Sequence, residues 1–223
     1  MDIIQQTLQS AIYTWDELNP ETQKLLVQSG HSSHFEEGQT LHAGNSDCTG
    51  FVAVLSGRLR AYMITDDGKE ITLFRLVEGD VCILSASCMM KNITFDVWVG
   101  AETEAEAVII PSAAYEAANE KDIRMLNFTN EIMQSRMSEV MWVLEKVLFM
   151  SFDKRLVEFL YDQSVLEQSL VLTITHEKIA GHLGSAREVV SRMLKYLASE
   201  GLIRVKRGQI EILDRKKLYD YIQ

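Results

Sequence analysis

A short run near the C-terminal end of the chain combines charged and polar side chains at helical spacing. Its apolar positions define one buried face, and five polar residues lie on or beside the opposite face: Arg187, Glu188, Ser191, Arg192 and Lys195. An arginine side chain donates two hydrogen bonds to O6 and N7 of guanine, and a glutamate accepts one from N4 of cytosine. Arg187, Glu188 and Arg192 are therefore predicted to read base edges in the major groove of double-stranded DNA.

The residues before and after this run predict the elements that would position it. Thr175 is a candidate N-cap for a first helix, Gly184 supplies a tight turn, and a second helix begins near Ala186. A helix at Asp153–Leu166 and a strand at Leu170–Ile174 come earlier. A hairpin of Leu202–Val205 and Ile210–Leu213 follows. Five residues are candidates for contacts to phosphates, the last two at the hairpin tip as a wing: Thr175, Ser185, Lys195, Lys206 and Arg207.

Charge is distributed unevenly along the 223 residues. The chain holds 22 Lys and Arg against 32 Asp and Glu, a net charge of −10. Residues 1–150 carry 10 basic and 22 acidic side chains, whereas residues 151–223 carry 12 basic and 10 acidic ones, a net of +2. Within 176–217 the balance is ten basic to five acidic. Positive charge thus gathers around the predicted helix-turn-helix, as binding to a phosphate backbone requires.

The segment from Ala113 to Met150 contains neither glycine nor proline and shows the repeat of a coiled coil. Seven of its residues recur at alternating spacings of four and three: Leu126, Asn130, Met133, Met137, Val140, Leu144 and Val147. Such a seam pairs two helices, and an asparagine within it can set their register. We expect a homodimer. The alternative is that the stripe packs on its own domain.

Short apolar runs separated by turn residues fill the chain from Ser32 to Pro111. Phe51–Leu55, Arg58–Ile64 and Glu70–Leu76 have the spacing of short antiparallel strands. A helix at Pro20–Ser29 precedes them, with Asn19 as its N-cap. The predicted fold class is α+β, with a jelly-roll-like antiparallel β-roll (residues 1–112), a dimerisation helix (113–150) and a C-terminal winged helix-turn-helix (151–223).

Over nearly its whole length the chain resembles the Crp/Fnr transcription regulators. The stretch ITHEKIAGHLGSAREVVSRMLKYLASEGLI looks like the recognition motif of that family, and EEGQTL, LSGRLR, DDGKEITLF and EGD resemble its cyclic-nucleotide-binding-type roll. The resemblance implies that Arg187, Glu188 and Arg192 fall where the family reads bases. It also implies a DNA half-site with a TGA-like core and a contact with RNA polymerase.

The cofactors best known in this family are not expected here. Aligned on Trp98-Val-Gly-Ala-Glu-Thr103, the resemblance places Phe95 and Asp96 at the Arg-Ser pair that binds the phosphate of a cyclic nucleotide. Phe95 offers no donor and Asp96 would repel the phosphate, so we expect no binding of cyclic AMP. The four cysteine ligands of the oxygen-sensing relatives are also missing, because the chain has three cysteines and none before Cys48. An iron–sulfur cluster of that type is not expected.

Sulfur-containing residues nevertheless gather in the segment that forms one wall of the family's ligand pocket. Cys82 and Cys88, with Met89 and Met90, have the chemistry to ligate haem or a soft metal or to form a redox pair, but they also suit a plain core. The candidate effector pocket, for haem or a small apolar effector, consists of Cys82, Cys88, Met89, Phe95, Asp96 and Trp98. Axial ligands could come from His31, His34 or His42, although hydrogen-bonded histidines are commoner.

Several function classes are disfavoured by the sequence. Three cysteines make no disulfide framework, and we find neither a membrane-spanning run nor a signal-peptide pattern, so we expect a cytoplasmic protein without a membrane partner. A cupin-like metal enzyme would need clustered ligands, and the roll has no His-x-His pair. A cyclic-nucleotide-dependent regulator is the other alternative. The expected function is that of a homodimeric regulator, not an enzyme, that binds palindromic DNA.

Overall fold

The computed structural model describes residues 3–44, 48–85 and 95–222 of the chain. It divides the chain into two compact units, residues 1–64 with 73–140 and residues 65–72 with 141–223. Each unit has a buried apolar core of its own. Within the described ranges, none of the helices has the length and apolar character that crossing a lipid bilayer would require.

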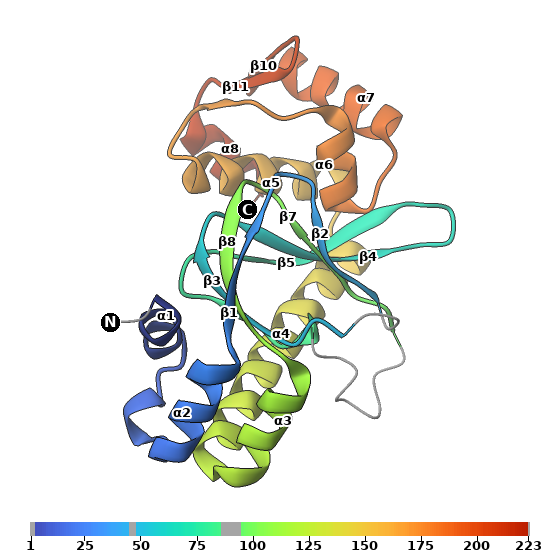
Figure 1. The fold of residues 1–223 in the computed structure, drawn as a ribbon. Coiled ribbons are helices and arrows are strands. Elements are labelled where there is room, and N and C mark those ends of the chain that lie inside the picture. The colour runs from blue at the N-terminus through green and yellow to red at the C-terminus, as the bar shows by residue number, and fades with distance from the viewer. Residues whose placement is uncertain (1–2, 45–47, 86–94, 223) are drawn as a thin grey trace. The chain divides into compact units, whose positions relative to one another are not determined.

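The first unit is built on two antiparallel four-stranded sheets (Figure 1). One sheet has the strand order β1-β8-β3-β6 and the other has the order β2-β7-β4-β5. The strands predicted from the sequence at 51–55, 58–64 and 70–76 are confirmed. The bounds are β1 (His31–Phe35), β2 (Thr40–Ala43), β3 (Phe51–Ser56), β4 (Leu59–Ile64), β5 (Glu70–Leu76), β6 (Val81–Cys82), β7 (Trp98–Ala101) and β8 (Ala105–Ile110).

The sheet that contains β3 is buried on both faces. Val52 and Val54 belong to the core cluster shared with the other sheet, whereas Phe51 and Ala53 belong to a second cluster with the helices. This division follows from the alternation of side chains along a strand. It explains why β3 reads as a continuous apolar run rather than as an alternating one.

Helices cover the outer face of that sheet. The helix predicted at Pro20–Ser29 is confirmed, but the side chain of Asn19 makes no capping hydrogen bond. The helix α1 was not predicted, and its Leu8 is fully buried against the sheet cluster. The bounds are α1 (Ile3–Ala11), the short 3₁₀ helix η1 (Trp15–Glu17), α2 (Pro20–Ser29), α3 (Ser112–Lys121) and α4 (Ile123–Phe149).

The single long helix predicted for 113–150 is wrong in one respect, because the chain breaks at Asp122 into α3 and α4. The backbone of Asp122 is extended, and its side chain is almost fully buried. One carboxylate oxygen accepts a hydrogen bond from the backbone N–H of Arg124 (3.1 Å), and the other accepts one from the N–H of Asn19 (2.6 Å). Asp122 therefore acts as an N-cap for α4 and ties it to the start of α2.

The second unit contains a helix-turn-helix and a small sheet of order β10-β11-β9. The predicted strand at 170–174 shortens to Val171–Leu172, and the C-terminal helix α8 was not predicted. That helix packs through the buried Leu218, and Arg215 donates to the carbonyl of Ser164 (2.9 Å). The bounds are α5 (Phe152–Leu166), β9 (Val171–Leu172), α6 (His176–Leu183), α7 (Arg187–Ser199), β10 (Ile203–Lys206), β11 (Gln209–Ile212) and α8 (Arg215–Ile222).

Candidate nucleic-acid interface

The turn between α6 and α7 has the geometry that the sequence predicts. The hydroxyl of Thr175 accepts a hydrogen bond from the backbone N–H of Lys178 (3.2 Å), which caps the start of α6. Gly184 ends α6 with a φ of 65°, a left-handed backbone that favours glycine. Its N–H donates to the carbonyl of Ala180. The two helices therefore meet at a short, defined turn.

The helix α7 has one buried side, as predicted, but its buried stripe is narrower than the one predicted from the sequence. Val190, Leu194 and Leu197 are fully buried, whereas Val189 and Met193 are only half-buried. Of the predicted base-reading residues, Glu188 and Arg192 lie on the opposite side, whereas Arg187 lies beside the buried stripe in the first turn. Of the five polar residues, Ser191 is half-buried and four are exposed: Arg187, Glu188, Arg192 and Lys195.

The hairpin of β10 and β11 forms the predicted wing. Lys206 pairs with Gln209 across the ladder, so the turn consists of Arg207 and Gly208, and Gly208 has a φ of 73°. The ammonium of Lys206 lies 3.2 Å from a carboxylate oxygen of Glu211, which also pairs with Arg204. These cations lower the pKa of Glu211. Arg207 is exposed at the tip.

One residue near this surface was missed by the sequence reasoning. His176 is the first residue of α6, directly after the cap, and is only partly exposed. Its pKa is lowered by burial and by the positive charge of Arg187. The start of α6 and the start of α7 thus lie close enough to interact electrostatically. A histidine one residue after an N-cap threonine was the available signal.

The predicted dimerisation seam on α4 is largely exposed in the single chain. Met133 and Val140 are half-buried against the roll core. The other five seam residues are exposed, with Met137 at 67% and Leu144 at 46%; the others are Leu126, Asn130 and Val147. Five of the seven seam residues are thus exposed in the single chain, and self-association through them stays a prediction.

The candidate effector pocket is only partly brought together. Cys88, Met89 and Met90 lie outside the described residues. Phe95 is 44% exposed and Asp96 is exposed, so neither belongs to the buried interior of the roll. Trp98 is half-buried at the start of β7, and Cys82 is fully buried in β6.

The described cysteines and histidines do not form a ligand cluster, and the pair of Cys82 with Cys88 considered from the sequence lies partly outside the described residues. Cys82 is a free thiol whose pKa is raised by burial, and Cys48 is disulfide-bonded. His42 is buried with Nδ1 3.3 Å from the hydroxyl of Thr49, while the exposed His34 lies 3.6 Å from Glu104. Across 3–44, 48–85 and 95–222, no group of three or more metal-ligating side chains is gathered.

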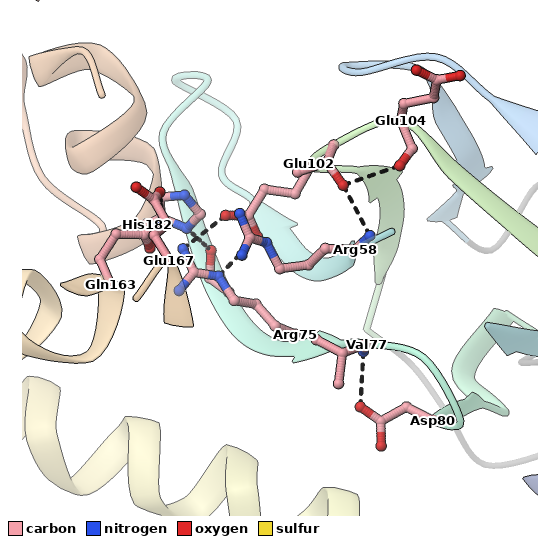
Figure 2. Close-up of polar contacts among 11 residues, drawn as sticks. Arg58, Arg75, Val77, Asp80, Glu102, Glu104, Gln163, Glu167 and His182 are labelled. Carbon is pink, nitrogen blue, oxygen red and sulfur yellow. Dashed lines mark hydrogen bonds and ion pairs between the residues drawn. The ribbon is translucent and has the colours of Figure 1, made fainter. Parts of the chain in front are cut away.

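A half-buried ion cluster joins three parts of the roll (Figure 2). The guanidinium of Arg75 on β5 donates to both carboxylate oxygens of Glu102, at 2.8 and 2.9 Å. Arg58 lies 3.3 Å from the same carboxylate. Burial lowers the pKa of Arg75, and Glu102 opposes that shift. The cluster holds the turns after β3 and β7 against β5, so we regard it as structural.

A roll followed by a long helix and a winged helix-turn-helix, with exposed Arg187, Glu188 and Arg192 on α7, is typical of a DNA-binding transcription regulator. Family comparisons agree along the chain. The Crp-like helix-turn-helix domain matches residues 154–221, and the cyclic nucleotide-binding domain matches residues 32–122. The chain belongs to the Crp/Fnr family of transcription regulators.

Individual relatives support this assignment. A protein from Eubacterium rectale assigned to the Crp/Fnr family is 44% identical, with 94% of this chain and 97% of that chain covered and a TM-score of 0.92. The fumarate and nitrate reduction regulatory protein of Vibrio cholerae is 27% identical over 196 residues, 83% of this chain and 76% of that protein. The c-di-GMP responsive global regulator CLP of Xanthomonas campestris shares the fold at 18% identity and a TM-score of 0.71, with 88% of this chain and 100% of that chain covered.

Proposed function

We propose that this chain is a homodimeric regulator that binds a palindromic DNA site through α7 and senses an effector in its β-roll. The observation that carries the proposal is the sidedness of α7. Glu188 and Arg192 are exposed on the side opposite to Val190 and Leu194, and Arg187 is exposed beside the buried stripe in the first turn of the helix. Those three side chains have the donors and the acceptor for base readout in a major groove.

The dimer follows from the exposed seam of α4. Two copies of the seam would bury side chains such as Met137 and Leu144 against each other. Pairing the two long helices also places two α7 helices in one molecule, as a two-fold symmetric site requires. The resemblance further implies a TGA-like core in each half-site and a contact with RNA polymerase. Because its target is chromosomal DNA, we place the protein in the cytoplasm.

The effector of the roll is proposed to be something other than cyclic AMP. The resemblance aligns Phe95 and Asp96 with the family's phosphate-binding pair, and neither side chain donates a hydrogen bond to a phosphate. Both are exposed. A cysteine binds haem iron as the thiolate. Burial raises the pKa of the free Cys82 thiol and so disfavours its thiolate form. A small apolar effector therefore fits the described interior better than haem. Saturable uptake of cyclic AMP at micromolar concentration would overturn this part.

A selection from a random pool of duplex DNA tests the proposal. We expect the purified chain to enrich a two-fold symmetric site with half-site centres about 10–11 base pairs apart. The variant Arg187→Ala with Arg192→Ala is expected to lose that enrichment. The matched control, Lys216→Ala with Lys217→Ala, changes two exposed cations on α8 and is expected to keep it. Equal enrichment by both double variants would contradict the assignment of α7 as the reading helix.

A further inference from the structure

Arg136 is a buried cation of the first unit that the proposed function does not yet use. It lies on α4 with its side chain only 11% exposed, and its guanidinium carbon sits 4.6 Å from the centre of the Phe74 ring. Phe74 belongs to the apolar core between the two sheets of the roll. The same guanidinium is close enough to act electrostatically on the Cys82 thiol. Arg136 therefore brings a positive charge to the interior of the roll.

The hydrogen bonds of Arg136 leave one edge of the guanidinium open at Nε, which has no acceptor among the described residues. Nη1 donates to both carboxylate oxygens of Glu139, each at 2.8 Å, and shares one hydrogen between them, because the two oxygens lie too close together to face both hydrogens of one nitrogen. Nη2 donates to the carbonyl of Val81 at 3.1 Å and carries a second hydrogen. Nε is buried and has no hydrogen-bond partner among the residues that the structure describes. An unmet buried donor costs roughly 1–3 kcal/mol.

The core cluster to which the neighbouring Phe74 belongs is apolar and adaptable. Phe74, Leu76, Cys82 and Leu84 belong to the core cluster of the roll. Partly buried side chains pack against this cluster from β4 and α4, namely Met63, Met133 and Val140. Methionine is flexible and fills irregular space, so two of these three side chains can repack around a guest molecule. A ligand at this place would present an apolar body to them and an acceptor to Arg136.

We propose that the roll binds a small apolar carboxylate whose two oxygens accept hydrogen bonds from Nε and Nη2 of Arg136. The proposal deepens the proposed function, since it names the chemical class of the effector. A carboxylate matches the two-donor edge of an arginine in a bidentate pair. A phosphate monoester carries nearly two charges and would need more than one cation in this apolar setting.

The site connects directly to the dimer seam. Glu139, which holds Nη1 of Arg136, is one residue before the seam residue Val140, and Arg136 is one residue before Met137. A second carboxylate on Arg136 competes with Glu139 for the same positive charge. Ligand binding thereby changes the electrostatics of α4 at the surface where two copies would meet.

Calorimetric titration of the full-length chain tests this site with named probes. The probes are 4-methylpentanoate and benzoate, each compared with its neutral amide, which keeps the shape and removes the charge. We expect both carboxylates to bind the wild-type chain about ten- to a hundredfold more tightly than their amides, the range of one or two charge-assisted hydrogen bonds. Arg136→Met is expected to lose that preference. Glu139→Gln is expected to bind the carboxylates several-fold more tightly, because the competing charge is gone.

Arg136 also contributes to packing, so each variant is first compared with the wild type by thermal melting without probe. Glu139→Gln leaves Arg136 in place and keeps the proposal testable if Arg136→Met does not fold. Equal binding of acid and amide, no binding of either acid at millimolar concentration, or unchanged binding in Glu139→Gln would overturn the proposal. DNA selection is measured separately. A chain that selects its palindrome but ignores the probes would refute this inference alone.

Discussion

Arg192 is the residue at which base readout can be separated most cleanly from electrostatic attraction. It is exposed in the middle of the polar face of α7, one turn beyond Glu188. We expect Arg192→Ala to lose about 1–3 kcal/mol of specific binding and to relax the preference at one base pair in each half-site. Competition with singly substituted sites measures both effects. An equal loss on every sequence would instead make Arg192 a phosphate contact.

His176 makes the stability of the second unit depend on pH. Its pKa is lowered from 6.5 by burial and by Arg187, so the unfolded chain binds that proton more readily than the folded chain. The part of the unfolding free energy that depends on a neutral His176 is fully present above about pH 6.5 and is lost as the pH falls below that value. We expect the urea midpoint of His176→Gln to fall less than that of the wild type between about pH 7 and pH 5. A parallel decline in both proteins would show that other groups dominate.

Single residues were predictable where the local chain decides their role. The Thr175 cap and the left-handed Gly184 are local features, and both were read from the sequence. Asp122 was not, because its acceptor role depends on Asn19, which is 103 residues away in the chain. The open edge of Arg136 was missed for the same reason. Its partners at Val81 and Phe74 come from distant strands of the roll.

At the scale of elements, α4 carries the prediction of self-association. Leu144→Glu would place two carboxylates in the apolar seam of the dimer. Because burying a leucine contributes about 1.5–3 kcal/mol and a symmetric seam holds two, we expect the dimer dissociation constant to rise at least about a hundredfold. Sedimentation velocity measures this constant. Ser135→Glu, at an exposed position on the side of the helix away from the seam, is the matched control and should dimerise like the wild type.

The elements that the sequence predicted are those with a strong period or clear turn residues. The strands β3, β4 and β5 lie between glycine turns, and α7 has a sharp amphipathic pattern. The helices α1 and α8 were missed because both are short and owe their position to packing, through Leu8 on the sheet cluster and Leu218 in the second core. The break between α3 and α4 has no glycine or proline to announce it.

At the scale of the whole molecule, the central claim is that two copies of the chain read two half-sites on one face of the DNA. In that arrangement the spacing of the half-sites is set by the dimer. Inserting five base pairs at the centre of the selected palindrome moves one half-site to the opposite face, by about half of a 10–10.5 base-pair turn.

The measurement is a binding titration of the wild-type chain with the original and the lengthened duplex, with the mass of each complex determined by sedimentation. We expect two chains on the original duplex and an affinity at least about a hundredfold lower on the lengthened one, because one set of base contacts is lost. Undiminished binding to the lengthened duplex, or one chain per original duplex, would contradict the claim.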